Sequence, residues 1–165
     1  MVDQWSDFFV AAGGAAAALT GLLFIAVSLR PREIRHSHLM VGRARSAFYA
    51  FATITLVALL ALAATSSRLV GVAQLAVAVG VLALSAPFTA AAIRAHRLNY
   101  ARAAFYHGGL VVLAAGGALR AVDGDSRDYS AVLATGVLLL LGIALSNSWQ
   151  LVLSHEADES DHDER

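Results

Sequence analysis

The sequence predicts an all-α fold, a polytopic bundle of five transmembrane helices, and three observations predict it. Of the 165 residues, 58% are apolar and only 15% are charged, whereas a soluble domain has about 25% charged residues. Five long runs contain no charged residue, and about 20 apolar residues cross the hydrocarbon core of a bilayer. The runs are apolar continuously rather than at alternate positions, which excludes a β-barrel. They are 8–29, 48–65, 69–93, 103–119 and 129–153.

The first run carries a pattern of small residues. Gly13, Ala17 and Gly21 recur at every fourth position, with Gly14 and Ala18 on the adjacent strip. No hydrophobic effect drives helices together in lipid, so small residues favour association by letting two backbones approach closely. The row Gly13, Ala17 and Gly21 therefore predicts a helix-packing contact, either inside the bundle or between copies.

Aromatic and polar residues precede this run. Trp5 and Phe8 suit the headgroup level of a bilayer. Ser6 or Asp7 is predicted to cap the helix N-terminus, because their side-chain oxygens can accept hydrogen bonds from the first exposed amides. The segment lacks the basic region of a cleavable signal peptide, so we expect the first helix to remain as an anchor.

The second and third runs are separated by residues 66–68 alone, which predicts a tight antiparallel hairpin. Pro87 lies inside the third run, where it removes a backbone donor and favours a kink. Ser85 and Thr89 lie near enough to compensate with their hydroxyl groups. A broken helix that lines a substrate site is the alternative interpretation of Pro87.

The fourth run, 103–119, is the least apolar, because it contains His107 and four glycines. Its 17 residues would reach only about 25 Å as a helix. An extension back to residue 99 or 100 repairs the length, since flanking arginines can extend their charged heads to the interface. The alternative is a bundle of four spans in which 103–119 is re-entrant.

The fifth run ends in a polar cluster, residues 146–150. Asn147 and Gln150 are three positions apart and share a helix face. We expect them to form hydrogen bonds across the bundle or to free carbonyl groups near Pro87. Together with Ser85 and Thr89, they are the candidates for an uncharged polar pathway.

Arginine placement predicts the orientation, because basic residues bias loops toward the cytoplasm. The connectors after the first and third runs contain five and three arginines, and those after the second and fourth contain one and two. We therefore expect the N-terminus outside and the C-terminus in the cytoplasm. All 12 basic residues are arginine and alanine is abundant, which indicates a GC-rich bacterial genome and hence a bacterial inner membrane. The basic first connector suits anionic lipids.

Groups that could carry chemistry are scarce. The five runs contain no acidic or basic residue except His107, whereas proton-coupled transporters and intramembrane enzymes need ionisable groups inside the membrane. The transmembrane domain, 1–154, is followed by an acidic tail, 155–165. On a helix, His155, Glu159 and His162 could bind a divalent metal. The tail has almost nothing apolar to pack, however, which favours disorder.

A resemblance emerges from residues 5–10 and 14–29, which begin with Trp5 and end with Leu29. This opening resembles that of a family of small uncharacterised bacterial membrane proteins. Asn147 and Trp149, with the aliphatic residues that follow, are similar to the end of the last helix in that family. Some relatives carry an automatically assigned label, modulator of the FtsH protease. The resemblance implies a polytopic membrane protein with no established activity.

These observations favour a non-enzymatic membrane subunit or modulator that acts through helix–helix contacts. We expect its partners to be the lipid bilayer, further copies in a homo-oligomer, or another membrane protein, and we expect no nucleic acid. The alternative is a small oligomeric channel or transporter for an ion or polar solute. We expect no catalytic residue, cofactor or metal site.

Overall fold

The computed structural model describes residues 4–29, 38–63, 67–94, 100–123 and 128–153. In this part of the chain it contains five α-helices and no strand, and each helix is long and apolar enough to cross a membrane. The predicted all-α bundle is thus confirmed. The helices are α1 (Gln4–Leu29), α3 (His38–Leu62), α4 (Ser67–Arg94), α5 (Tyr100–Asp123) and α6 (Asp128–Leu153).

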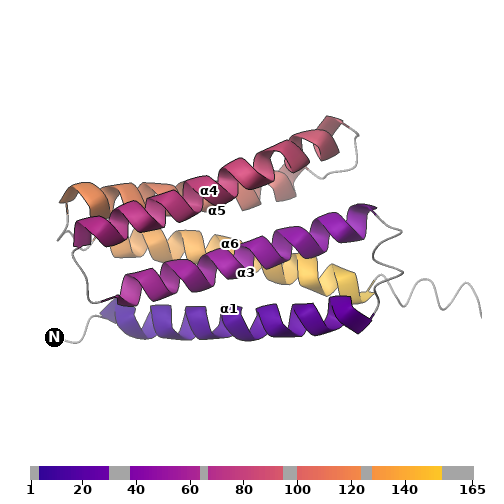
Figure 1. The fold of residues 1–165 in the computed structure, drawn as a ribbon, viewed down its shortest axis with the longest axis horizontal. Coiled ribbons are helices and arrows are strands. Elements are labelled where there is room, and N and C mark those ends of the chain that lie inside the picture. Colours follow the sequence, from indigo (N-terminus) through magenta and orange to yellow (C-terminus); the bar gives the residue numbers. More distant parts are fainter. Residues whose placement is uncertain (1–3, 30–37, 64–66, 95–99, 124–127, 154–165) are drawn as a thin grey trace, which may run out of the picture.

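Four of the helices close a ring. α4 packs against α5, α5 against α6, α6 against α3, and α3 against α4. α1 lies outside this ring, against α3 and to a smaller extent α6, and it forms the lowest layer of Figure 1. The chain crosses the bundle five times in alternating directions, so α1, α4 and α6 begin at the same end. We call this the N-terminal end and the other the arginine-rich end.

The structure corrects the predicted boundaries of two spans. The second helix begins at His38 rather than at residue 48, so it includes Arg43 and Arg45, and it ends at Leu62 rather than at 65. The fourth is a continuous helix of 24 residues, Tyr100–Asp123; it begins at the extended start that the sequence analysis offered, and it ends at Asp123 rather than at residue 119. Charge-free runs underestimate the length of these helices, because an arginine near a helix end can bury its aliphatic stem and keep its guanidinium at the interface.

The start of α1 also differs from the prediction. The helix begins at Gln4, so Ser6 and Asp7 lie inside its first turn, and the prediction that either residue precedes and caps it is wrong. Asp7 instead places a negative charge near the positive end of the helix dipole. Trp5 and Phe8 form an edge-to-face pair with ring centroids 6.0 Å apart.

Glycines bring α5 close to both of its neighbours. A Cβ atom on Gly117 would lie 2.7 Å from the backbone nitrogen of Leu75 in α4, and one on Gly71 of α4 would meet the α5 backbone at residues 117–121. On the side toward α6, a Cβ on Gly116 would lie 2.8 Å from the side chain of Leu133. The glycines that weaken the hydropathy of α5 thus permit its close packing.

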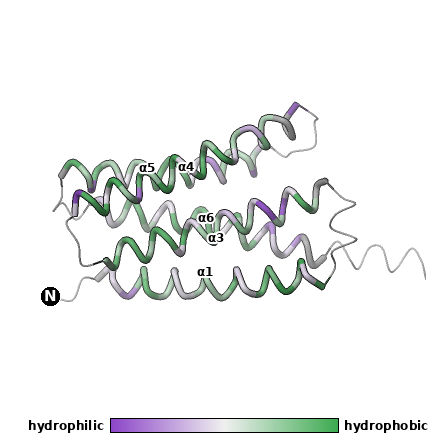
Figure 2. The backbone as a smooth tube through the Cα atoms, in the orientation of Figure 1, coloured by the Kyte–Doolittle hydropathy of each residue, from purple (hydrophilic) through white to green (hydrophobic). Residues whose placement is uncertain are grey.

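Apolar residues form both the inside and the outside of the bundle. Large side chains such as Phe24, Leu59 and Leu84 are more than half exposed, and Figure 2 shows hydrophobic residues along the middle of the helices. Lipid solvates such a surface, whereas water would not. The largest fully buried apolar side chains come from α3, α5 and α6 and include Phe51, Ile54, Leu110, Leu113, Leu133 and Leu140.

Candidate functional site

The structure divides the small-residue row of α1. Gly13 is buried against α3, where an added Cβ would lie 2.8 Å from the Cβ of Ala58. Ala17 and Gly21 are exposed, and a Cβ on Gly21 would meet no atom within 4 Å. One member of the predicted row therefore packs inside the bundle, and two do not.

The exposed small residues of α1 form a surface of their own. Gly14, Ala17, Ala18 and Gly21 are all exposed, and a Cβ on Gly14 would meet no atom within 4 Å. Their spacing of three, four and seven positions places them on one helical face. We call these four residues the open face of α1. Its shape suits a second helix at close range, because small residues lower the distance between two helix axes.

The polar residues of α6 connect it to two helices at the arginine-rich end. Asn147 is buried, and its Nδ2 donates a hydrogen bond to the Oγ of Ser46 on α3 at 3.0 Å. Ser46 donates in turn to the carbonyl oxygen of Arg43 at 3.0 Å. Asn147 thus forms a hydrogen bond across the bundle, and its partner is a serine that the sequence did not single out.

Gln150 uses a different partner. Arg102 of α5 donates one terminal nitrogen to the Oε1 of Gln150 and the other to the Oγ of Ser146, the latter at 2.7 Å. The planar guanidinium suits such a fork, since its donors point in fixed directions. This contact ties the start of α5 to the end of α6.

Ser85 and Thr89 donate their hydroxyl groups to their own helix. The acceptors are the carbonyl oxygens of Leu82 at 3.2 Å and of Ser85 at 3.1 Å. α4 continues through Pro87 as one helix to Arg94, so it is not a broken helix. The four residues of the predicted polar pathway therefore bond to α3, α5 and α4 itself.

A cation–π contact joins α3 and α4 beside Pro87. The guanidinium carbon of Arg45 lies 3.4 Å from the ring centroid of Phe88, and its Nε donates to the hydroxyl oxygen of Tyr49 at 3.4 Å. An aromatic face attracts a cation through its quadrupole. Arg45 is therefore held by two aromatic residues at the arginine-rich end.

Of the ionisable candidates named from the sequence, His107 is the one that lies among the described residues. The Nδ1 of His107 lies 2.9 Å from the carbonyl oxygen of Ala103, one turn back in the same helix. Among the described residues, no group of three His, Cys, Asp or Glu side chains could hold a metal. His155, Glu159 and His162 lie outside the described residues.

Gln74 and Arg120 are buried polar residues that the sequence analysis did not single out. Gln74 of α4 is fully buried, and its Nε2 donates to the carbonyl oxygen of Val57 on α3 at 3.3 Å. Arg120 of α5 is only 7% exposed. A lone amide inside a long apolar run was a usable signal for Gln74. Arg120 offered none, because its burial depends on the helices that surround it.

Comparisons with protein-family models, with curated proteins and with solved structures give no match. The resemblance of residues 5–29 to a family of small bacterial membrane proteins therefore stays a prediction. The geometry of this chain alone carries the functional argument.

Proposed function

We propose that the protein is a non-enzymatic membrane subunit or modulator that acts through helix–helix contacts, and that the open face of α1 is its contact surface. The observation that carries this proposal is that Gly14, Ala17, Ala18 and Gly21 are exposed on the helix that lies outside the ring. The partner we favour is a second copy of the chain, with another membrane protein as the alternative.

The same chain supports this use of small residues. Gly71 and Gly117 already bring α4 and α5 into backbone contact, so close packing through glycine is part of its architecture. Two α1 helices related by a two-fold axis would present the same face to each other, as symmetric dimers do. In lipid, the dispersion attraction between two closely spaced backbones favours association.

The oligomeric state of the purified protein in mild detergent tests the proposal. We expect a dimer that Gly14→Leu or Gly21→Leu dissociates, because leucine would hold the two backbones apart. The matched control is Gly142→Leu on α6, since Gly142 is also exposed and a Cβ there would meet no atom within 4 Å. The control should remain dimeric, and all three variants should fold.

Two results would count against the contact surface. One is that both leucine variants assemble as the parent protein does. The other is that the parent protein is monomeric and that no membrane protein co-purifies with it in a manner sensitive to Gly14→Leu.

A flux measurement separates this proposal from the channel or transporter alternative. We expect liposomes that contain the protein to show little ion flux. Robust flux that disappears in the double variant Asn147→Leu with Gln150→Leu, while folding and assembly survive, would contradict the binding-subunit proposal.

We further propose that the membrane is a bacterial inner membrane and that the N-terminal end of the bundle faces outward, as the arginine distribution favours. Because the native chain has no cysteine, single cysteines introduced at positions 38 and 125 can report this. A membrane-impermeant thiol reagent should label position 125 and not position 38 in intact cells. The reverse pattern would overturn the orientation.

A further inference from the structure

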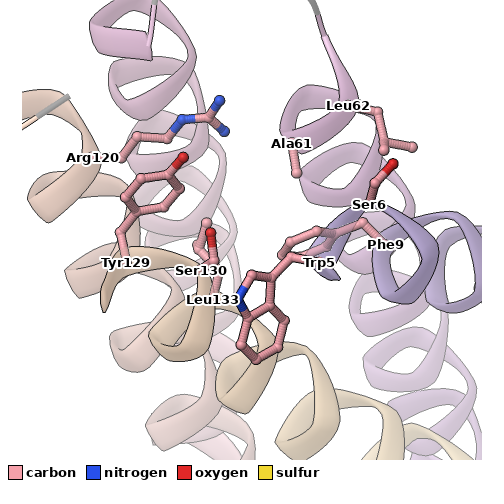
Figure 3. Close-up of a pocket in the computed structure, with 9 residues that line it drawn as sticks. All are labelled: Trp5, Ser6, Phe9, Ala61, Leu62, Arg120, Tyr129, Ser130 and Leu133. Carbon is pink, nitrogen blue, oxygen red and sulfur yellow. The ribbon is translucent and has the colours of Figure 1, made fainter. Parts of the chain in front are cut away.

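A cavity of about 220 Å³ lies at the N-terminal end of the bundle, between α1, α3, α5 and α6. In Figure 3, Arg120, Tyr129 and Ser130 lie on one side of it and Ala61 and Leu62 on the other. The indole of Trp5 projects between the two sides, and the remaining lining residues are Ser6, Phe9 and Leu133. A volume of this size is large enough for several water molecules or a small organic group.

Arg120 is the charged residue of this cavity. Its Nε donates to the Oγ of Ser67 at 3.5 Å, and its guanidinium carbon lies 5.1 Å from the ring centroid of Tyr129. In the described part of the chain, its two terminal amino groups have no hydrogen-bond acceptor. A buried charge without a counter-charge costs several kcal/mol. Among the side chains that the structure describes, none supplies a counter-charge to Arg120, so the cavity presents strong donors that favour an oxyanion.

The rest of the lining has a mixed character. Ser6 and Ser130 supply hydroxyl groups, whereas Trp5, Phe9 and Leu133 supply apolar and aromatic walls. Asp7, the neighbour of Ser6, is exposed and does not line the cavity. A ligand that satisfies all of these groups needs an anionic end and an apolar body.

We propose that this cavity binds an amphiphilic anion, with its phosphate or carboxylate group on Arg120 and its apolar part against Trp5, Phe9 and Leu133. Two sources share this chemistry: the headgroup region of an acidic phospholipid and a soluble aromatic carboxylate. The site lies apart from the open face of α1 and does not depend on the proposed function.

The fluorescence of Trp5 provides a direct measurement. The chain has two tryptophans, and Trp149 is 63% exposed on α6 near the arginine-rich end, so Trp149→Phe leaves Trp5 as the sole reporter. This variant, in neutral detergent, is titrated with dihexanoyl phosphatidylglycerol, with its neutral phosphatidylcholine counterpart and with benzoate. We expect a saturable change with at least one of the two anions and none with phosphatidylcholine.

Substitutions of arginine test the role of its charge. Arg120→Gln should weaken binding at least tenfold. Arg94→Gln should leave it unchanged, because Arg94 is exposed at the opposite end and donates to the carbonyl oxygen of Ala90 in its own helix. Should Arg120→Gln fail to fold, Ala61→Leu fills the cavity while it keeps the arginine, and it should weaken binding to a similar extent.

The outcomes are distinct. A response to phosphatidylglycerol alone identifies a lipid, a response to benzoate alone identifies a soluble acid, and a response to both identifies a general oxyanion site. The proposal is overturned if neither anion gives a saturable change or if phosphatidylcholine acts equally. It is also overturned if Arg120→Gln, or Ala61→Leu in its place, binds as tightly as the parent.

Discussion

α1 and α5 are both rich in glycine and alanine, yet the bundle uses these residues in different ways. In α5, a Cβ added to Gly109, Gly116 or Gly117 would lie 3.0 Å or less from an atom of a neighbouring helix. In α1, Gly14 and Gly21 have no atom within 4 Å of such a Cβ. Three of the four glycines of α5 therefore pack against a neighbouring helix, whereas in α1 Gly13 does so and Gly14 and Gly21 remain open.

Position in the ring explains the difference. α5 has a neighbour on each side, α4 and α6, whereas α1 lies outside the ring and contacts mainly α3. A glycine in a helix costs about 0.5–1 kcal/mol relative to alanine, and α5 recovers this cost through close packing within the chain. The open face of α1 recovers nothing there, which is why we propose a contact with a second helix.

The largest effect is expected where two backbones meet. Gly71→Ala and Gly117→Ala should each lower the free energy of unfolding by about 3 kcal/mol, because backbone atoms of the facing helix cannot move aside. The double variant should cost less than the sum, since the two positions contact each other. Unfolding by sodium dodecyl sulfate in mixed micelles measures this. Near-parental stability would contradict the close approach of α4 and α5.

A smaller effect is expected where glycine faces a flexible side chain. A Cβ on Gly116 would lie 2.8 Å from the side chain of Leu133, and one on Gly136 of α6 would lie 2.7 Å from Cδ2 of Leu113. The backbone nitrogens of these leucines would be farther away, at 3.2 and 3.0 Å. A leucine can change its rotamer, so Gly116→Ala or Gly136→Ala should cost about 1.5 kcal/mol. The same titration should rank these variants clearly below Gly117→Ala in their effect.

A substitution at the contact between α1 and α3 should cost less stability still, and a second substitution on the facing helix should recover it. Gly13→Ala should cost about 1 kcal/mol, because its Cβ would meet that of Ala58. Moving the methyl group from one helix to the other, with Gly13→Ala and Ala58→Gly combined, should restore most of the loss. A double-mutant cycle measures this coupling. A purely additive result would show that the two residues do not touch.

The smallest effect is expected on the open face. Gly14→Ala and Gly21→Ala should not destabilise the monomer, and the better helix propensity of alanine should raise stability by up to about 1 kcal/mol. A loss near that of Gly13→Ala, measured under monomeric conditions, would mean that the face is covered within the chain. It would remove the contrast between α1 and α5.

Particular residues show how far the sequence could predict this fold. Hydropathy alone gave five helices and their order, because an apolar run of spanning length has few other stable arrangements in a membrane. It misplaced the start of α3 because Arg43 and Arg45 lie inside the helix. The polar cluster of the last run predicted that Asn147 and Gln150 form hydrogen bonds across the bundle. It did not predict their partners, which are Ser46 for Asn147 and Arg102 for Gln150. Those partners are 101 and 48 residues away, and no local pattern connects them.

The sequence by itself determined the class of molecule, the number of helices and the scarcity of reactive groups, since these follow from composition and the length of each run. The tertiary structure decided which glycines are buried and which form the open face of α1. It also decided that Arg120, two residues from the end of its span, lines a cavity with Trp5 and Tyr129. Helix periodicity places residues on faces, but the neighbours of each face depend on how all five helices pack together.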